Sequence, residues 1–155
     1  MQVLFVCTGN TCRSPMAECF LAAEIARRNL SGVTVRSAGI AACTNTPISA
    51  QALELLRLDE NIDASAFRSS RLSVELIDSS DLIVTMGASH ADAICRALPD
   101  CREKVKCLLD LCGDGGDVPD PFGGDVDHYR KVFSIMRPAL VKLADLIENR
   151  KISIQ

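Results

Sequence analysis

A cysteine and an arginine near the start of the chain stand at a spacing that suits phosphate chemistry. Cys7 and Arg13 are separated by five residues in the segment CTGNTCRS, which ends on Ser14. A cysteine thiolate is a strong nucleophile, and the planar guanidinium of arginine can hold two phosphoryl oxygens through paired N–H donors. The pattern predicts hydrolysis of a phosphate ester or phosphoramidate through a cysteinyl-phosphate, with Cys7 and Arg13 as catalytic residues.

The flanking residues place this segment between a buried strand and a helix. Residues 3–6, with the sequence VLFV, are apolar throughout, which favours a strand buried on both faces. Ser14 is a good helix cap, and Pro15 suits the first helical position. The backbone N–H groups between strand and helix can then converge on an anion, and the helix dipole favours both that anion and the thiolate of Cys7.

We therefore expect residues 7–14 to form a phosphate-binding loop. Gly9 would let the backbone turn tightly, and Asn10 tolerates a left-handed conformation. The Ser14 hydroxyl would lie close enough to donate to the thiolate and to assist its later departure. The predicted members of the loop are Cys7, Thr8, Gly9, Asn10, Thr11, Cys12, Arg13 and Ser14.

A second segment, DVPDPFGG at residues 117–124, supplies a candidate acid. Pro121 biases Asp120 towards an extended conformation, and Gly123 and Gly124 mark a mobile or tightly turned loop. A carboxylic acid on such a loop can protonate a leaving group and afterwards activate water. Asp120 is therefore the predicted general acid.

The two segments together resemble the low-molecular-weight protein-tyrosine phosphatase family, and the resemblance covers nearly the whole chain. It implies that Asp120 is the general acid and that the reaction needs no metal and no cofactor. It also implies a flavodoxin-like α/β fold, a three-layer sandwich with a four-stranded parallel sheet in the order 2-1-3-4. Ser37 is expected from the resemblance to hydrogen-bond Asn10 and so support the loop.

The residues around the loop bear on the substrate. Members that act on phosphotyrosine usually carry a bulky aliphatic residue where this chain has Thr11, and an aromatic in the loop after the second strand. Here residues 40–48 contain no aromatic, and Phe122 is followed by two glycines. The chain is more similar to the bacterial protein arginine phosphatase branch, in which a threonine at this position is associated with phosphoarginine. Thr11 and Phe122 are the predicted selecting residues, and phosphotyrosine is the alternative.

Two further alternatives are weaker. Thioredoxin-coupled arsenate reductases share the fold and the loop but need two more cysteines after the third strand. This chain has Met86 and Gly87 there, and Cys95 and Cys101 follow on a predicted helix and its exit. A catalytically inactive phosphate-binding module is disfavoured, because the nucleophile, the arginine and the acid are all present.

Composition indicates one compact domain over residues 1–155. Apolar residues make up 48% of the chain, and the net charge of −3 comes from interspersed acids and bases. This pattern does not favour nucleic acid as a partner, and no apolar stretch reaches the ~18–20 residues of a membrane span. We expect a cytoplasmic monomer that acts on phosphorylated proteins.

The eight cysteines are expected to be reduced. No secretory signal precedes the first strand, and no C-x2-C pair or neighbouring histidine suggests a metal site. Cys7 and Cys12 share the short loop, so a reversible disulfide between them is a plausible response to oxidant.

Strands and helices alternate along the chain, which predicts a parallel sheet covered on both faces. We expect strands at about 2–7, 33–37, 82–85 and 105–108, and helices at about 14–29, 49–58, 69–78, 89–98 and from 126 to 150. Pro138 should kink the last helix or divide it in two. His90 and His128 are expected to be surface or capping residues, and Tyr129 to pack on the final helix.

Overall fold

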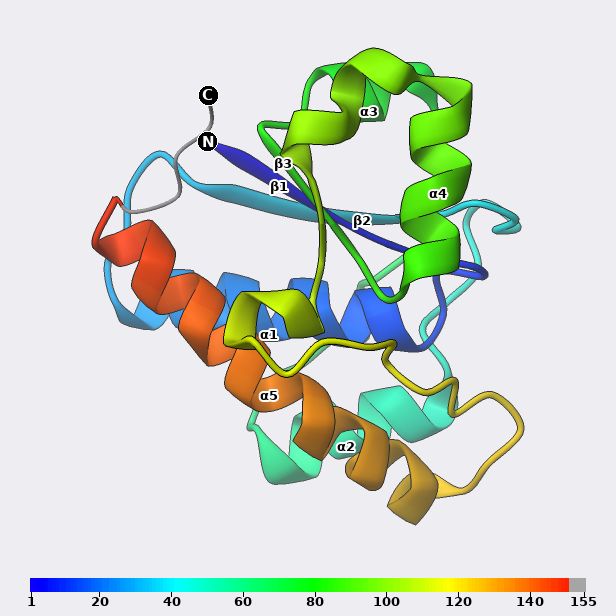
Figure 1. Cartoon of the computed structure of the whole chain (residues 1–155). Helices are drawn as coiled ribbons and strands as arrows, with labels where there is room; N and C mark the ends of the chain where they lie inside the picture. Colours follow the sequence, from blue (N-terminus) through cyan, green and yellow to red (C-terminus); the bar gives the residue numbers. More distant parts are fainter. Residues whose placement is uncertain (151–155) are drawn as a thin grey trace.

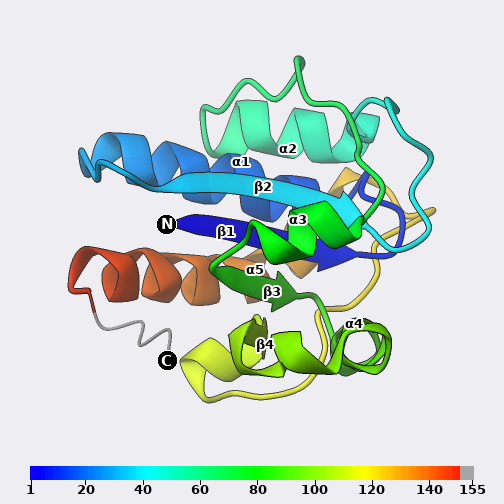
Figure 2. The same cartoon turned by 90° about the horizontal axis from the view of Figure 1, so that it is seen from above.

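The computed structural model describes residues 1–150 and contains a four-stranded parallel sheet. The strand order is β2-β1-β3-β4, which confirms the predicted order (Figure 2). The strands are β1 (Gln2–Cys7), β2 (Thr34–Gly39), β3 (Leu82–Thr85) and β4 (Val105–Cys107). Cys7 pairs with Gly39, and Val6 pairs with Thr85, so the end of β1 is flanked by both neighbouring strands.

Helices cover both faces of the sheet and complete a three-layer α/β sandwich (Figure 1). One face carries α1, α2 and α5, and the other carries α3 and α4. The bounds are α1 (Arg13–Arg27), α2 (Ala50–Asp59), α3 (Val74–Asp78), α4 (Ala88–Ala97) and α5 (Val126–Glu148), with 3-10 turns at Pro99–Lys104 and Leu109–Cys112.

The central strand β1 is buried on both faces, as its apolar sequence predicts. Val3 and Phe5 pack into the core beneath α1, α2 and α5, whereas Leu4 and Val6 pack against α3 and α4. All four side chains are fully buried. Since successive side chains of a strand point to opposite faces, an unbroken apolar run is what a doubly covered strand requires.

Three details of the predicted helices are wrong. The helix α1 begins at Arg13, and its N-cap is Cys12, not Ser14. Only Val74–Asp78 of the segment predicted at 69–78 is helical, because Ser73 caps that helix and its hydroxyl accepts from the Leu76 amide. Of the two outcomes predicted at Pro138, division of the last helix is wrong, and a kink stays a prediction.

The helix α5 runs continuously through Pro138. Proline at this position leaves the Ser134 carbonyl without its helical donor. Both residues lie on the exposed side of α5, so water can satisfy that carbonyl and the helix can continue.

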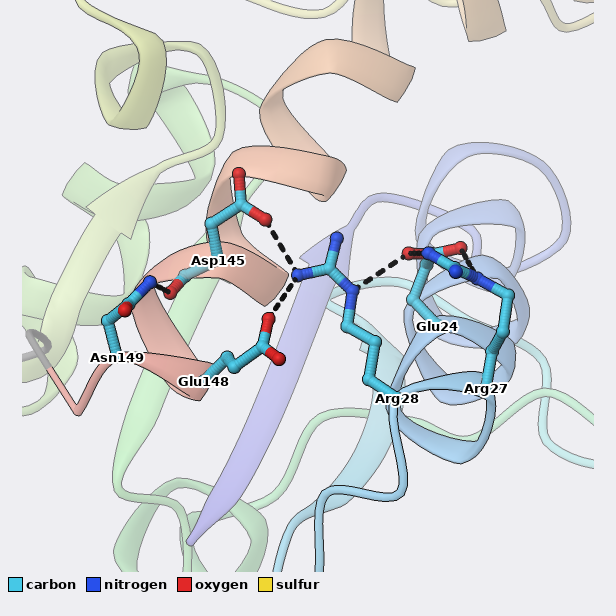
Figure 3. Close-up of polar contacts among 6 residues, drawn as sticks. All are labelled: Glu24, Arg27, Arg28, Asp145, Glu148 and Asn149. Atoms are coloured by element: carbon cyan, nitrogen blue, oxygen red, sulfur yellow. Dashed lines mark hydrogen bonds and ion pairs between the residues drawn. The ribbon is translucent and has the colours of Figure 1, made fainter.

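Arg28, just after α1, ties this helix to the end of α5 (Figure 3). Its Nη1 donates to Asp145 Oδ1 at 2.6 Å and to Glu148 Oε2 at 3.0 Å. Its Nε donates to Glu24 Oε2 at 3.1 Å. Only 11% of the Arg28 side chain is exposed, so this network is better shielded than an ordinary surface ion pair.

Candidate active site

The predicted phosphate-binding loop, residues 7–14, lies where the carboxyl end of β1 meets the N-terminus of α1. Strand β1 has β2 on one side and β3 on the other, so successive strands leave it in opposite directions. In open α/β sheets, ligands bind at such a reversal point. The sheet therefore places the loop where the fold opens a crevice.

The Cys7 sulfur sits among hydrogen-bond donors. Its Sγ lies 2.8 Å from Ser14 Oγ and accepts from the Asn10 amide at 3.3 Å. Only 3% of Cys7 is exposed. Ser14 is the second residue of α1, so its hydroxyl serves the cysteine instead of capping the helix. Donors directed at a sulfur favour its thiolate form.

Asn10 connects the loop to the rest of the protein. Its φ of 54° is left-handed, as predicted, whereas Gly9 is not among the residues with positive φ. Asn10 Nδ2 donates to Ser14 Oγ at 2.9 Å and to Ser37 Oγ at 2.8 Å, and Oδ1 accepts from the Ser70 amide at 2.7 Å. The side chain is fully buried, and all its polar atoms are used.

Glu18 extends this network and was missed from the sequence. Ser37 Oγ donates to Glu18 Oε2 at 2.5 Å. Each serine oxygen accepts one N–H from Asn10 and keeps its own hydrogen, which Ser37 donates to Glu18 and Ser14 can donate to Cys7. Burial raises the pKa of Glu18 above its ordinary value, although the hydrogen bond from Ser37 opposes the rise.

Arg13 is buried and fixed by two contacts. Its Nη1 donates to the Val118 carbonyl at 3.1 Å, and its Nη2 lies 3.3 Å from Asp120 Oδ2. The structure therefore brings the predicted nucleophile loop and the predicted acid together. About half of the Asp120 side chain is exposed, so it can reach a ligand as well as the arginine.

The segment that carries Asp120 is anchored at its first residue. Asp117 Oδ1 accepts from the Ala88 amide at 2.8 Å and so caps α4. A Cβ atom at Gly87 would lie 2.7 Å from the Asp117 carboxylate, which explains the glycine. Further along the segment, Asp120 Oδ1 accepts from the Phe122 amide at 3.1 Å.

A cavity of about 250 Å³ opens over the loop. Phe122 stands at its rim with 80% of its surface exposed, an unusual exposure for an aromatic side chain. The lining residues are Cys7, Thr8, Gly9, Asn10, Thr11, Cys12, Arg13, Asp120 and Phe122. The predicted nucleophile, arginine, acid and selecting residues thus share one cavity.

The loop after β2 runs beside the phosphate-binding loop without contributing an aromatic ring. The Ile40 amide donates to the Cys7 carbonyl at 3.0 Å, and the Ala41 amide donates to the Thr8 carbonyl at 2.9 Å. The Thr11 carbonyl accepts from the Ser49 amide at 2.9 Å. The backbone around Thr11 is therefore fixed, and its side chain lines a cavity with Phe122 as its single aromatic residue.

Two residues to which the sequence assigned no role in the site, His90 and Tyr129, contact the loop. His90, predicted to be a surface or capping residue, is buried, with Nε2 3.0 Å from Thr8 Oγ1. Tyr129, on α5, is buried with its hydroxyl 3.0 Å from Cys12 Sγ. Burial and the contact with Cys12 raise the pKa of Tyr129 to about 12. Both contacts join segments that are far apart in the sequence, so no local sequence pattern predicts them.

The remaining cysteines add no second site. All eight cysteines are free, and no group of three or more potential metal-ligating side chains occurs within residues 1–150.

Within residues 1–150, none of the helices combines the length and apolar character needed to cross a membrane.

Comparison with known proteins agrees with this geometry. Residues 2–152 match the family model for low molecular weight phosphotyrosine protein phosphatase. The chain is 42% identical to a protein-arginine-phosphatase of Bacillus subtilis (strain 168), over 96% of this chain and 98% of the relative. It is 36% identical to the low molecular weight protein-tyrosine-phosphatase PtpB of Staphylococcus haemolyticus (strain JCSC1435), over 92% and 97% of the two chains.

A solved structure shows the same likeness. The YwlE arginine phosphatase, in a mutant with a phosphorylated active-site serine, superposes with a TM-score of 0.90. The two sequences are 38% identical, and the match covers 99% of this chain and 100% of the other. With nearly the full length matched in sequence and fold, the chain belongs to the low molecular weight phosphotyrosine protein phosphatase family, whose members are cysteine-based phosphatases.

Proposed function

We propose that this protein removes phosphate from phosphoarginine in proteins, with Cys7, Arg13 and Asp120 as the catalytic residues. The observation that carries the proposal is the cavity itself. It combines a thiol, a buried guanidinium and a half-exposed carboxyl group with Thr11 at its wall and no aromatic from the loop after β2. Phosphorylated proteins are then the partners of the enzyme.

In the first step, the Cys7 thiolate attacks phosphorus and the S–P bond forms as the P–N bond breaks. Asp120 gives its proton to the departing guanidino nitrogen. Arg13 and the loop amides stabilise the negative charge of the phosphoryl oxygens, so this mechanism does not require a metal ion. Ser14, 2.8 Å from the sulfur, stabilises the thiolate before attack and as it leaves again.

In the second step, water replaces the sulfur. The Asp120 carboxylate takes a proton from the water, whose oxygen attacks phosphorus. The S–P bond breaks, inorganic phosphate leaves, and the Cys7 thiolate and the Asp120 proton are restored. The YwlE mutant carries a phosphate on its active-site serine. This supports a covalent phosphoryl intermediate on the active-site residue, which is Cys7 in this chain.

Selection of the arginine side chain rests on Thr11 and Phe122. A threonine hydroxyl can hydrogen-bond a guanidinium or its water, whereas an aliphatic side chain would desolvate that group without compensation. A planar guanidinium can also stack on the exposed ring of Phe122. The Bacillus subtilis relative, named a protein-arginine-phosphatase, supports this assignment.

Phosphotyrosine is the second candidate. Phe122 could form one wall of a slot for a phenol ring, and the staphylococcal relative is named a protein-tyrosine-phosphatase. We do not propose arsenate reduction, because Cys95 and Cys101 are buried at α4 and the turn after it, outside the cavity.

The test compares kcat/KM on two peptides of the same sequence, one with phosphoarginine and one with phosphotyrosine. We expect a clear preference for phosphoarginine, and we expect Thr11→Ile to shift the ratio by at least about tenfold towards phosphotyrosine. Thr11→Ser keeps the hydroxyl and should keep the preference. If the ratio of the two kcat/KM values is unchanged in Thr11→Ile, Thr11 does not select the substrate.

We also propose that the enzyme works as a monomer in the cytoplasm. Eight unpaired cysteines suit a reducing compartment. Light scattering of the purified, reduced protein should give the mass of one chain, and a dimer mass would contradict the proposed monomer.

A further inference from the structure

His90 is a buried polar side chain next to the site, and one of its ring nitrogens has no partner. It is the third residue of α4, and 7% of its surface is exposed. Its Nε2 lies 3.0 Å from Thr8 Oγ1. Its Nδ1 is buried with no hydrogen-bond partner among residues 1–150. A lone buried nitrogen of this kind restricts which form the imidazole can take.

The surroundings of His90 favour the neutral ring. Burial and the charge of Arg13 lower the pKa of His90, and Asp117 and Asp120 only partly oppose them. The ring also lies in the first turn of α4, where the helix dipole is positive. A neutral imidazole carries one N–H, on either Nδ1 or Nε2.

The contacts decide between these two tautomers. With the hydrogen on Nδ1, the single N–H of the ring would be buried without an acceptor. With the hydrogen on Nε2, that N–H donates to Thr8 Oγ1, and Nδ1 carries a bare lone pair in place of an unpaired N–H. The second arrangement leaves no donor unpaired.

The direction of this bond determines what Thr8 can do. Because Thr8 Oγ1 accepts from His90, its own hydrogen remains available for another acceptor. Thr8 is exposed and lines the cavity above Cys7. No hydrogen bond from Thr8 Oγ1 to a carboxylate or carbonyl is present within the described residues, so this hydrogen is free to donate to a ligand in the cavity.

We propose that His90 is a positioning residue that acts through Thr8: it donates to the Thr8 hydroxyl and so directs that hydroxyl to donate to an oxygen of the bound phosphoryl group. The inference rests on the proposed function only in that the cavity binds a phosphoryl group. It holds equally for an arginine or a tyrosine substrate. Thr8 thereby adds a side-chain donor to the amides and guanidinium of the loop.

The experiment measures inhibition by inorganic phosphate in four proteins: the wild type, His90→Met, Thr8→Val and the double variant. Turnover is followed with whichever phosphopeptide the enzyme hydrolyses, so a wrong substrate assignment would leave this test intact. His128, the other histidine, is exposed on α5. His128→Met is the matched control and should equal the wild type.

We expect His90→Met and Thr8→Val each to raise the inhibition constant of phosphate by about tenfold, the value of one hydrogen bond to a charged group. The double variant should be no worse than Thr8→Val alone, because His90 acts only through that hydroxyl. His90→Gln, whose amide can donate in place of Nε2, should recover most of the loss, and Thr8→Ser should bind phosphate like the wild type.

Two results would overturn the proposal. One is an unchanged inhibition constant in Thr8→Val, since the hydroxyl would then not touch the anion. The other is multiplication of the two single effects in the double variant, which would mean that His90 braces the fold independently of Thr8. If His90→Met fails to fold, nitrogen NMR of the imidazole in the wild type decides the question: a hydrogen on Nε2 is expected, and a hydrogen on Nδ1 would overturn the proposal.

Discussion

The guanidinium of Arg13 lies 3.3 Å from the carboxylate of Asp120 and joins the phosphate-binding loop to the segment that carries the candidate acid. Arg13 is buried, whereas 53% of the Asp120 side chain is exposed. The same guanidinium also donates to the Val118 carbonyl, at the base of that segment. One residue therefore holds the acid over the cavity and remains able to bind phosphoryl oxygens.

The role of Asp120 predicts a dependence on the leaving group. Asp120→Asn cannot supply a proton, so kcat on a poor leaving group such as phenyl phosphate should fall by about 10²–10³-fold. On 4-nitrophenyl phosphate, whose leaving group needs little protonation, the loss should be about tenfold or less. Steady-state kinetics on the two esters check this prediction.

The matched control for this measurement is Asp114→Asn. Asp114 is an exposed acid in the same stretch of chain, outside the cavity. The Asp114→Asn variant should therefore have the same kcat as the wild type on both esters. Equal losses on the two esters in Asp120→Asn would show that Asp120 positions the loop without acting as the acid.

The buried network around Asn10 predicts a loss of stability. Asn10→Ala removes three hydrogen bonds and places alanine at a left-handed φ of 54°. We expect the free energy of unfolding to fall by about 3 kcal/mol. Urea unfolding measures this change.

Asn45→Ala separates the two causes. Asn45 also has a left-handed φ, of 66°, but is exposed. The Asn45→Ala variant should lose only about 1 kcal/mol of unfolding free energy, which is the cost of placing alanine at a left-handed φ. Its inhibition constant for phosphate should stay unchanged. A loss in Asn10→Ala no larger than that in Asn45→Ala would mean that the side-chain network contributes little.

Glu18 predicts a pH dependence of stability. Because burial raises its pKa in the folded state, the folded protein keeps this proton at pH values where the unfolded chain has lost it. The stability linked to this proton is complete below the unfolded pKa of about 4.5 and is lost as the pH rises through the raised value. Glu18→Gln stays neutral and can still accept from Ser37.

The free energy of unfolding of Glu18→Gln should therefore increase relative to the wild type as the pH rises from about 4.5 through the raised pKa of Glu18. The difference between the two proteins isolates this group, since His90 titrates in both. A difference that stays constant over this range would contradict the raised pKa.

Much of this arrangement was predictable from local sequence. The apolar run at residues 3–6 predicts a doubly covered strand, and the loop that follows predicts an anion site at its end. Asn10 is left-handed, as its residue type suggests. These features depend on neighbours in the chain, and local patterns describe them well.

The contacts of Glu18, His90 and Tyr129 were not predictable in the same way. Each joins the phosphate-binding loop or its support to an element far away in sequence, and a single side chain carries no periodicity. Ser14 illustrates a competition between two uses of one residue. A serine before Pro15 suggests a helix cap, but its hydroxyl contacts the Cys7 sulfur instead.

Cys12 predicts a reversible response to oxidation. Peroxide converts the Cys7 thiolate to a sulfenic acid, and attack by the Cys12 thiol would then form the disulfide and release water. The wild type should regain activity with added thiol after mild peroxide, whereas Cys12→Ser should progress to irreversible sulfinic acid at Cys7. Peptide mapping by mass spectrometry distinguishes the products, and sulfinic acid alone in the wild type would rule out protection by Cys12.

The most direct measurement is a rapid acid quench of the protein mixed with a phosphoarginine peptide, followed by mapping of the phosphorylated residue by mass spectrometry. We predict phosphate on Cys7, formed and lost at rates that account for kcat, and we expect turnover of Cys7→Ser to fall by at least about a thousandfold. Hydrolysis of the peptide without a phosphorylated Cys7, or with phosphate on another residue, would contradict the account.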